Sequence, residues 1–152
     1  MPAFDEVWTS IAPLWAALSG DARDRLAASP EEAGEAAVFR IATSEVDEAP
    51  ALPEGADLVE APLGAYDIVE LTLFGRPAAK ARIAFGNGIA AVGRFEFEPG
   101  QSPDQLGPGL LSALAQEAFA EGAETIYTVA DGTEQPPYLG PGWTEAGRLR
   151  RA

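Results

Sequence analysis

The chain has 152 residues, enough for one ordinary domain, and 47% of them are apolar, as is usual for globular proteins. It contains no cysteine and no histidine, which excludes disulfides, thiolate nucleophiles, and the commonest metal ligand and general base. The net charge of −14 disfavours nucleic acid and anionic membranes as partners. Solubility is the simpler explanation of this charge, and a cationic substrate such as an amine is the functional one.

No segment approaches the ~18 apolar residues of a membrane span. The N-terminal residues Met1 to Glu6 lack the basic start of a secretion signal. We therefore expect a cytoplasmic protein that binds neither membrane nor metal.

The first segment has the pattern of an amphipathic helix, with one apolar face formed by Val7, Ile11, Leu14, Trp15 and Leu18. Pro13 falls inside this pattern and is expected to kink or divide the helix. A second short helix is predicted over residues 22–28. Ser29-Pro30-Glu31-Glu32 has the residues of a capping box and predicts a further helix start.

Residues 38–43 predict a strand, 44–55 a loop, and 66–74 a second strand. The Asn87-Gly88 pair lies between two apolar runs and is typical of a two-residue hairpin turn. The runs at 79–85 and 89–98 should therefore form antiparallel strands.

Residues 100–109 are rich in glycine and proline and predict a loop. A helix should follow and end at Gly122, and its apolar stripe consists of Leu110, Leu111, Leu114, Ala118 and Phe119. The run at 125–130 predicts a strand parallel to 89–98, and 144–150 a last strand. These elements indicate one mixed α/β domain.

This order resembles the second half of the GNAT superfamily of acyl-CoA N-acyltransferases. The resemblance covers Gly75 to Ala152 and includes the turn at Gly75-Arg76-Pro77, the strand ending Phe95-Glu96-Phe97-Glu98-Pro99, and Tyr138 followed by Gly142-Trp143. Residues 39–43 are similar to the family's first strand. The resemblance implies a single GNAT-like α+β domain over 1–152, with residues 1–36 an N-terminal helical segment. Its mostly antiparallel central sheet would carry helices on both faces.

The family binds coenzyme A through a glycine-containing loop whose backbone N–H groups approach the diphosphate. Two alignments place that loop here. One puts it on Ser102 to Gly107 and keeps only the last glycine. The other puts it on Asp104 to Gly109, keeps both glycines, and makes Gln105, Leu106, Gly107 and Gly109 cofactor-binding residues.

A proline removes an N–H donor in either alignment, and Asp104 brings negative charge toward the diphosphate. Ser102-Pro103-Asp104-Gln105 is also a capping box with proline at the first helical position. The segment is therefore equally consistent with an ordinary helix start.

The resemblance implies further roles. Phe95, Glu96 and Phe97 would lie where the family's fourth strand separates from the fifth and pairs with the pantetheine arm. Alternatively, they form an ordinary alternating strand. Tyr138 would protonate the leaving thiolate, or else it is a packed loop tyrosine. Glu96 or Glu98 would act as general base through water. Asp131 stands where the family often has an asparagine contacting the cofactor arm.

The sequence thus predicts an acyl-CoA-dependent N-acyltransferase, with acetyl-CoA or another acyl-CoA as co-substrate and a small amine as acceptor. A homodimer is a possible assembly. The alternatives are a catalytically inactive GNAT-like binding or regulatory domain and an unrelated α+β domain. In the last case, the strands at Phe97 and Val129 would not separate.

Overall fold

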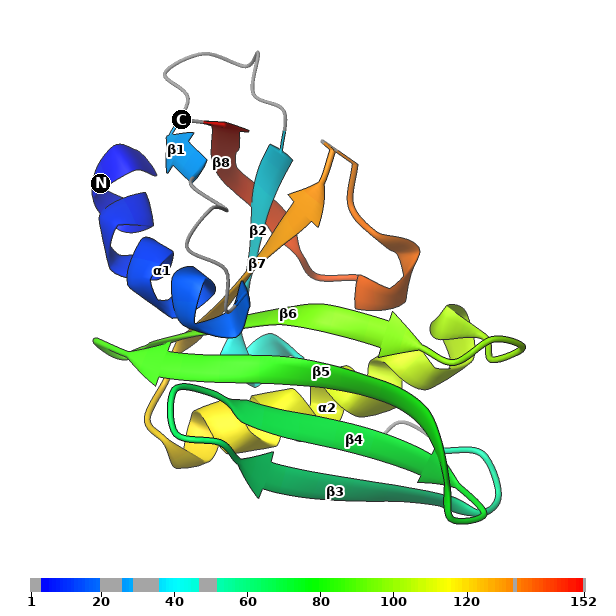
Figure 1. The fold of residues 1–152 in the computed structure, drawn as a ribbon. Helices are drawn as coiled ribbons and strands as arrows, with labels where there is room; N and C mark the ends of the chain where they lie inside the picture. Colours follow the sequence, from blue (N-terminus) through cyan, green and yellow to red (C-terminus); the bar gives the residue numbers. More distant parts are fainter. Residues whose placement is uncertain (1–3, 20–25, 29–35, 47–51, 133, 152) are drawn as a thin grey trace.

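The computed structural model describes residues 4–19, 26–28, 36–46, 52–132 and 134–151. These residues form one eight-stranded sheet in the order β1-β8-β2-β7-β6-β5-β4-β3, with a long helix on each face (Figure 1). Among the strand pairs described, only β6 and β7 are parallel. The predicted mixed, mostly antiparallel sheet with helices on both faces is therefore confirmed.

The strands are β1 (Leu26–Ala28), β2 (Ala36–Ala42), β3 (Ala56–Pro62), β4 (Asp67–Leu73), β5 (Arg76–Gly86), β6 (Ile89–Phe97), β7 (Thr125–Asp131) and β8 (Thr144–Arg151). The helices are α1 (Phe4–Ser19) and α2 (Pro103–Ala120), with short 3-10 turns η1 (Thr43–Glu45) and η2 (Pro137–Leu139). No helix in these ranges is long and apolar enough to cross a membrane.

Helix α1 packs its apolar face on β5 and β6, as its periodicity predicts. Leu18 is fully buried against Ala84 and Ala91 of these strands, whereas Ile11 is fully buried in a cluster with residues of the neighbouring strands β2, β7 and β8. Pro13 lies inside the helix without dividing it. The predicted helix over 22–28 is wrong at its end, because Leu26–Ala28 pairs with β8 as a strand. Residues 22–25 and the predicted helix start at Ser29 lie outside the described residues.

The central hairpin forms where the Asn87-Gly88 pair predicts it. Both residues have the positive φ, 55° and 77°, that a two-residue hairpin turn requires. The predicted strand at 66–74 is confirmed as β4. Sequence reasoning missed β3, because its exposed edge position removes the clear alternation of apolar residues. Of residues 39–43, which are similar to a family first strand, 39–42 lie in β2 and Thr43 begins η1. Strand β2 lies between β7 and β8.

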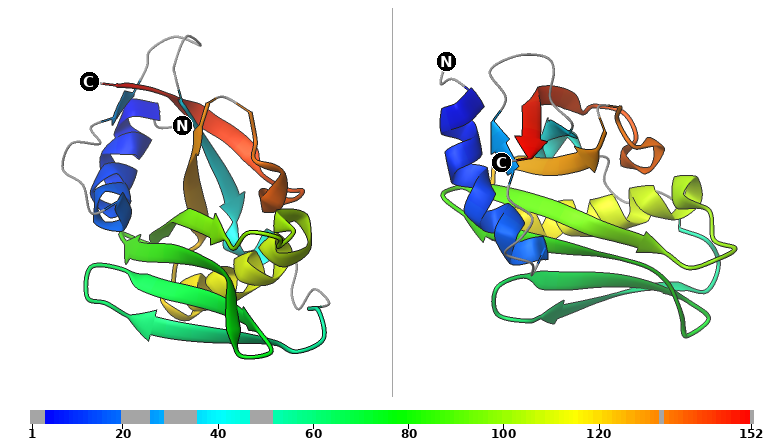
Figure 2. Two further views of the ribbon diagram at one scale, coloured as in Figure 1. Left: turned by 45° about the vertical axis from the view of Figure 1, so that its right-hand side comes forward. Right: turned by 45° about the horizontal axis from the view of Figure 1, so that its top comes forward.

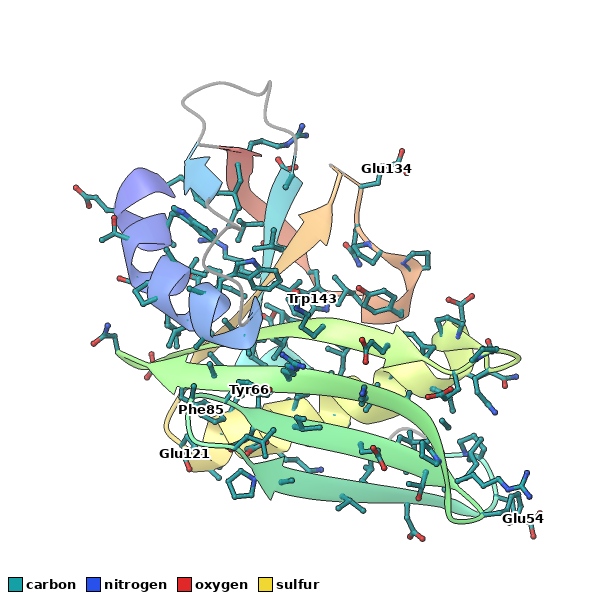
Figure 3. All side chains as sticks on the ribbon, in the orientation of Figure 1. Glu54, Tyr66, Phe85, Glu121, Glu134 and Trp143 are labelled. Carbon is teal, nitrogen blue, oxygen red and sulfur yellow. The ribbon has the colours of Figure 1, made fainter. Side chains whose placement is uncertain are left out.

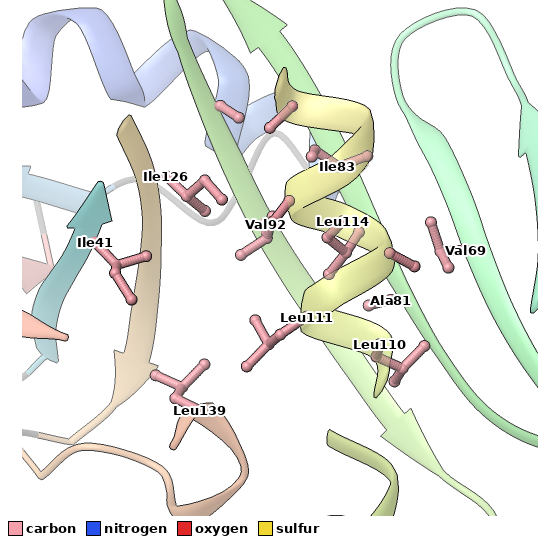
Figure 4. Close-up of a cluster of buried hydrophobic side chains, with 14 of the residues drawn as sticks. Ile41, Val69, Ala81, Ile83, Val92, Leu110, Leu111, Leu114, Ile126 and Leu139 are labelled. Atoms are coloured by element: carbon pink, nitrogen blue, oxygen red, sulfur yellow. The ribbon is translucent and has the colours of Figure 1, made fainter. Parts of the chain in front are cut away.

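Helix α2 covers the opposite face of the sheet and builds the main core (Figure 4). Leu110 and Leu114 are fully buried against side chains of β4, β5 and β6, a burial worth roughly 1.5–3 kcal/mol for each leucine. The helix begins at Pro103, so the predicted loop over 100–109 is too long by two helical turns. Phe119 is predicted to belong to the apolar stripe, but its side chain is 77% exposed. It follows the buried Ala118 by one residue and therefore points about 100° away from it around the helix.

Glu117 lies on α2 where the helix passes the start of β4 and the edge strand β3. The pKa of Glu117 is raised from 4.5 to about 8. Burial is the largest cause, and a hydrogen bond with Asp67 and repulsion by Asp67, Glu60 and Glu121 add to it. Figure 3 shows Glu121 at the same end of α2. At neutral pH the Glu117 side chain therefore keeps its proton in the folded protein.

This raised pKa predicts that stability falls with rising pH. The unfolded chain loses the Glu117 proton near pH 4.5, whereas the folded protein keeps it until about pH 8. The contribution is fully present below pH 4.5 and is lost as pH rises through about 8. Glu117→Gln should flatten the curve of melting temperature against pH and exceed the wild type above pH 8. Exposed Glu54→Gln removes one equal charge and should leave the curve's shape unchanged. Parallel curves for wild type and Glu117→Gln would contradict the assignment.

Candidate functional site

The parallel strands β6 and β7 separate after three residue pairs. Ile89, Ala90 and Ala91 pair with Thr125, Ile126 and Tyr127, and no pairing follows although β6 continues to Phe97. Each strand keeps its other neighbour, since β5 pairs with β6 and β2 with β7 along their lengths. Figures 1 and 2 show the two parts of the sheet diverging from this seam. The separation predicted between Phe97 and Val129 is thus present, which rules out the unrelated-domain alternative.

A bulge in β6 lies at the start of the gap. The register between β5 and β6 shifts between Lys80 and Arg82, so that β6 carries one extra residue there. Arg94 has φ of 54°, a left-handed conformation that is rare for a residue other than glycine. A bulge of this kind bends its strand and redirects the following side chains, and bulges are common beside active sites. Here it turns the end of β6 away from β7.

The gap contains a cavity of about 370 Å³ that reaches both faces of the sheet. Its lining residues are Trp15, Gly93, Arg94, Phe95, Glu96, Thr128, Val129, Ala130, Pro136 and Tyr138. Trp15 comes from α1 on one face, whereas Pro136 and Tyr138 belong to the segment around η2, which packs with α2 on the other. Two substrates could therefore enter from opposite faces of the sheet and meet inside the cavity.

Three aromatic side chains form one wall of this site. The Tyr138 ring lies 4.8 Å from the Phe95 ring and 5.5 Å from the Phe97 ring, measured between centroids. The 3-10 turn that carries Tyr138 is anchored by buried Leu139 and by Trp143, whose indole N–H donates to the Leu139 carbonyl at 3.0 Å. Trp143 is labelled in Figure 3. Phe95, Phe97 and Tyr138, predicted separately from the sequence, are thus brought together.

Glu96 lines the same cavity but its side chain belongs to the other face. Side chains alternate along a strand, so Glu96 points away from Phe95 and Phe97. Its carboxylate is 62% exposed and forms an ion pair with Lys80 at 3.2 Å. Lys80 also lies in register with Glu70 of β4. The predicted base therefore lies at the site, beside a cation and in contact with water.

Thr128 is the buried hydroxyl of the site. It follows Tyr127, the last residue of β7 paired with β6, and so marks the point where the gap opens. Its residue is only 4% exposed and lines the cavity. The buried polar atom of the cavity wall that has no hydrogen-bond partner within the described residues is the indole nitrogen of Trp15. A buried N–H group without a partner costs free energy.

The residues predicted to hold a diphosphate lie at the start of α2. Gln105 is exposed, whereas Leu106 is buried in the core. Gly107 and Gly109 lie within the helix and face protein: a Cβ on Gly107 would lie 2.6 Å from the Tyr138 carbonyl oxygen, and one on Gly109 would meet Leu52. Asp131 ends β7 opposite Ala36, and its side chain lies outside the described part of the structure.

Sequence reasoning missed seven of the residues that line the cavity: Trp15, Gly93, Arg94, Thr128, Val129, Ala130 and Pro136. Trp15 carried only the signal of a core position on α1, and it approaches β6 because Gly93 has no side chain: a Cβ there would lie 2.7 Å from the indole ring. Arg94 carried no signal, since a bulge has no fixed sequence pattern. A threonine in a β-branched run gave no sign that it would line a cavity.

No protein-family model matches this sequence, and no curated protein sequence matches it. Solved structures do resemble the fold. A GCN5-related N-acetyltransferase from Kribbella flavida aligns with 74% of this chain and 55% of its own, with a TM-score of 0.62 and 14% identity. One from Anabaena variabilis aligns with 80% of this chain and 40% of its own, with a TM-score of 0.55 and 10% identity.

A protein from Novosphingobium aromaticivorans assigned to the GNAT family of acetyltransferases aligns with 93% of this chain and 80% of its own, with a TM-score of 0.54 and 17% identity. The present chain therefore spans about half the length of the first two structures and most of the third. At these identities the similarity concerns the fold alone. The predicted resemblance is confirmed at that level: the chain has the fold of the GCN5-related N-acetyltransferases.

Two buried threonines in different surroundings should respond differently to replacement by valine. Thr43 donates to the Ala123 carbonyl at 2.8 Å, so Thr43→Val should lower the free energy of unfolding by about 1 kcal/mol or somewhat more. Thr128→Val should change it by less than about 0.5 kcal/mol, because the Thr128 side chain lines the cavity. Urea denaturation of both variants measures the difference. An equal loss in both would show that Thr128 is structural.

Proposed function

We propose that this protein transfers an acyl group, with acetyl as the expected group, from a coenzyme A thioester to a small amine. The observation that supports the proposal best is the cavity between β6 and β7 with Tyr138 in its wall. The fold shared with N-acetyltransferases supports it as well. The net charge of −14 is compatible with an amine that arrives as a cation.

The pantetheine arm of the donor fits the gap in size and chemistry. Beyond Ala91, the backbone groups of β6 that face β7 have no strand partner, so an extended amide-containing arm can pair with them as an added strand would. Phe95, Phe97 and Tyr138 provide an apolar wall for the arm. In this role the backbone N–H groups beside the bulge at Arg94 would polarise the thioester carbonyl.

The two sides of the cavity have different roles in this proposal. The donor would enter from the face of α2 and η2, where Tyr138 lies, and the amine from the face of α1, where Trp15 and Glu96 lie. Because Glu96 is well exposed and paired with Lys80, it would take the proton of the ammonium through an intervening water. The neutral amine would then attack the thioester directly.

Tyr138 would complete the reaction by protonating the departing thiolate. A phenol has an ordinary pKa near 10, which suits it to donate a proton to a thiolate. The packing of Tyr138 between Phe95 and Phe97 and the anchoring of η2 by Trp143 would hold the phenol in place. Preorganisation of this kind reduces the entropic cost of orienting the acid.

A second candidate is a binding or regulatory domain of the same fold without catalysis. The packing of Gly107 and Gly109 against protein favours it, because these glycines are not open to a phosphate. Such a domain would bind the donor's arm without turnover. The two candidates differ in whether free thiol is released when an amine is present.

Replacement of Tyr138 by phenylalanine separates these candidates. In an acyltransferase, Tyr138→Phe should lower kcat by about 100-fold, the lower end of a general acid's contribution, while KM for acetyl-CoA changes little. Thiol release with a panel of small amines measures the rate. Tyr66→Phe is the control, since the Tyr66 ring stacks on Arg82 away from the cavity. An unchanged rate in Tyr138→Phe would remove the tyrosine from the mechanism, and acetyl-CoA binding without thiol release from the wild type would favour the regulatory domain.

A further inference from the structure

The start of α2 offers few backbone donors to a diphosphate. A helix N-terminus binds phosphate through N–H groups that have no partner within the chain. Here the first helical residue is Pro103, which has no N–H. The N–H groups of Gln105 and Leu106 donate to the Ser102 carbonyl at 3.1 and 3.0 Å, and that of Gln101 donates to Glu98 at 3.0 Å. These donors are already used inside the chain.

The space beside the two glycines is filled by the protein. Gly107 faces the backbone of Tyr138 and Gly109 faces Leu52, so neither leaves room for a phosphate above it. Pro108, between them, removes a further N–H and lies against Leu139, Gly140 and Trp143 in a small cavity. Gly107 permits close packing of α2 against η2, and Gly109 permits close packing of α2 against Leu52.

The charge of this segment also opposes a diphosphate. Glu98 and Asp104 are exposed on either side of the helix start. The sequence has no lysine or arginine between Arg94 and Arg148, so α2 and its approach carry no cation. A diphosphate brought here would meet like charges without a compensating positive side chain.

The walls of the cavity, by contrast, suit a neutral chain. Pantetheine consists of amides, methylene groups and a thiol, and it needs backbone pairing, an apolar wall and hydrogen-bonding groups. The unpaired edge of β6, the rings of Phe95 and Phe97, and the Thr128 hydroxyl provide these.

We infer that the donor end of this site recognises the thioester-bearing arm and not the diphosphate of coenzyme A. The inference rests on the proposed acyl transfer and extends its donor class from coenzyme A thioesters to pantetheine thioesters in general. The nucleotide part then contributes little to binding. Arg76 is the cation that could hold the phosphates instead, because it lines a separate cavity of about 590 Å³ together with Gln101 of the loop before α2.

Acetyl-CoA and S-acetylpantetheine, which lacks phosphate and nucleotide, test the inference directly. With one amine acceptor, kcat/KM for the two donors should agree within about threefold, because the nucleotide then contributes less than about 0.65 kcal/mol. Calorimetric titration of both donors gives a readout apart from turnover. A preference for acetyl-CoA above about tenfold would overturn the inference alone. Failure of the wild type to bind either donor would overturn the proposed function, and this inference with it.

Charge variants provide the second measurement. Asp104→Asn should improve binding of acetyl-CoA by about threefold and leave S-acetylpantetheine unchanged, because the removed repulsion acts on phosphates only. Asp57→Asn on exposed β3 changes the net charge equally and should alter neither donor. Arg76→Gln should leave the ratio of the two donors unchanged. If it weakens acetyl-CoA alone, Arg76 holds the phosphates and the inference is wrong.

Discussion

The separation of the parallel strands β6 and β7 is the constraint on which the rest of the site depends. Three residue pairs hold the strands together at one end, and the bulge at Arg94 turns β6 away after them. The gap costs little, because β5 continues to pair with β6 and β2 with β7. Only one side of each strand therefore lacks hydrogen-bond partners, and that side faces the cavity.

The two faces of the sheet give the gap two different sides. On one face the absence of a side chain at Gly93 lets Trp15 of α1 approach β6 closely. On the other face η2, held by Leu139 and Trp143, places Tyr138 against Phe95 and Phe97. The alternation of side chains along β6 then separates an apolar wall from the carboxylate of Glu96. One strand thus presents an apolar wall on one face and a carboxylate on the other.

The position of Tyr138 and the closed start of α2 have one cause. The 3-10 turn reaches the gap because its backbone packs directly on Gly107, where a Cβ would collide with the Tyr138 carbonyl. The same packing fills the space that a phosphate would need. Gly107 therefore supports the aromatic wall of the site, and the space beside it is closed to a phosphate. This explains why a segment with the family's glycine spacing forms an ordinary helix start.

Local chemistry in the sequence determined α1, the hairpin at Asn87-Gly88, the unit of β6, α2 and β7, and the absence of histidine and cysteine chemistry. These features depend on neighbours within a few residues, such as apolar spacing, turn residues and helix caps. The sequence also indicated Phe95, Phe97 and Tyr138 as site residues, through the family resemblance.

Only the tertiary structure decided that β2 lies between β7 and β8, that β3 forms the exposed edge, and that Thr128 stands where the gap opens. It also decided that Gly107 and Gly109 face protein. These outcomes depend on which distant segments pack together, and residue type and local spacing do not specify those contacts.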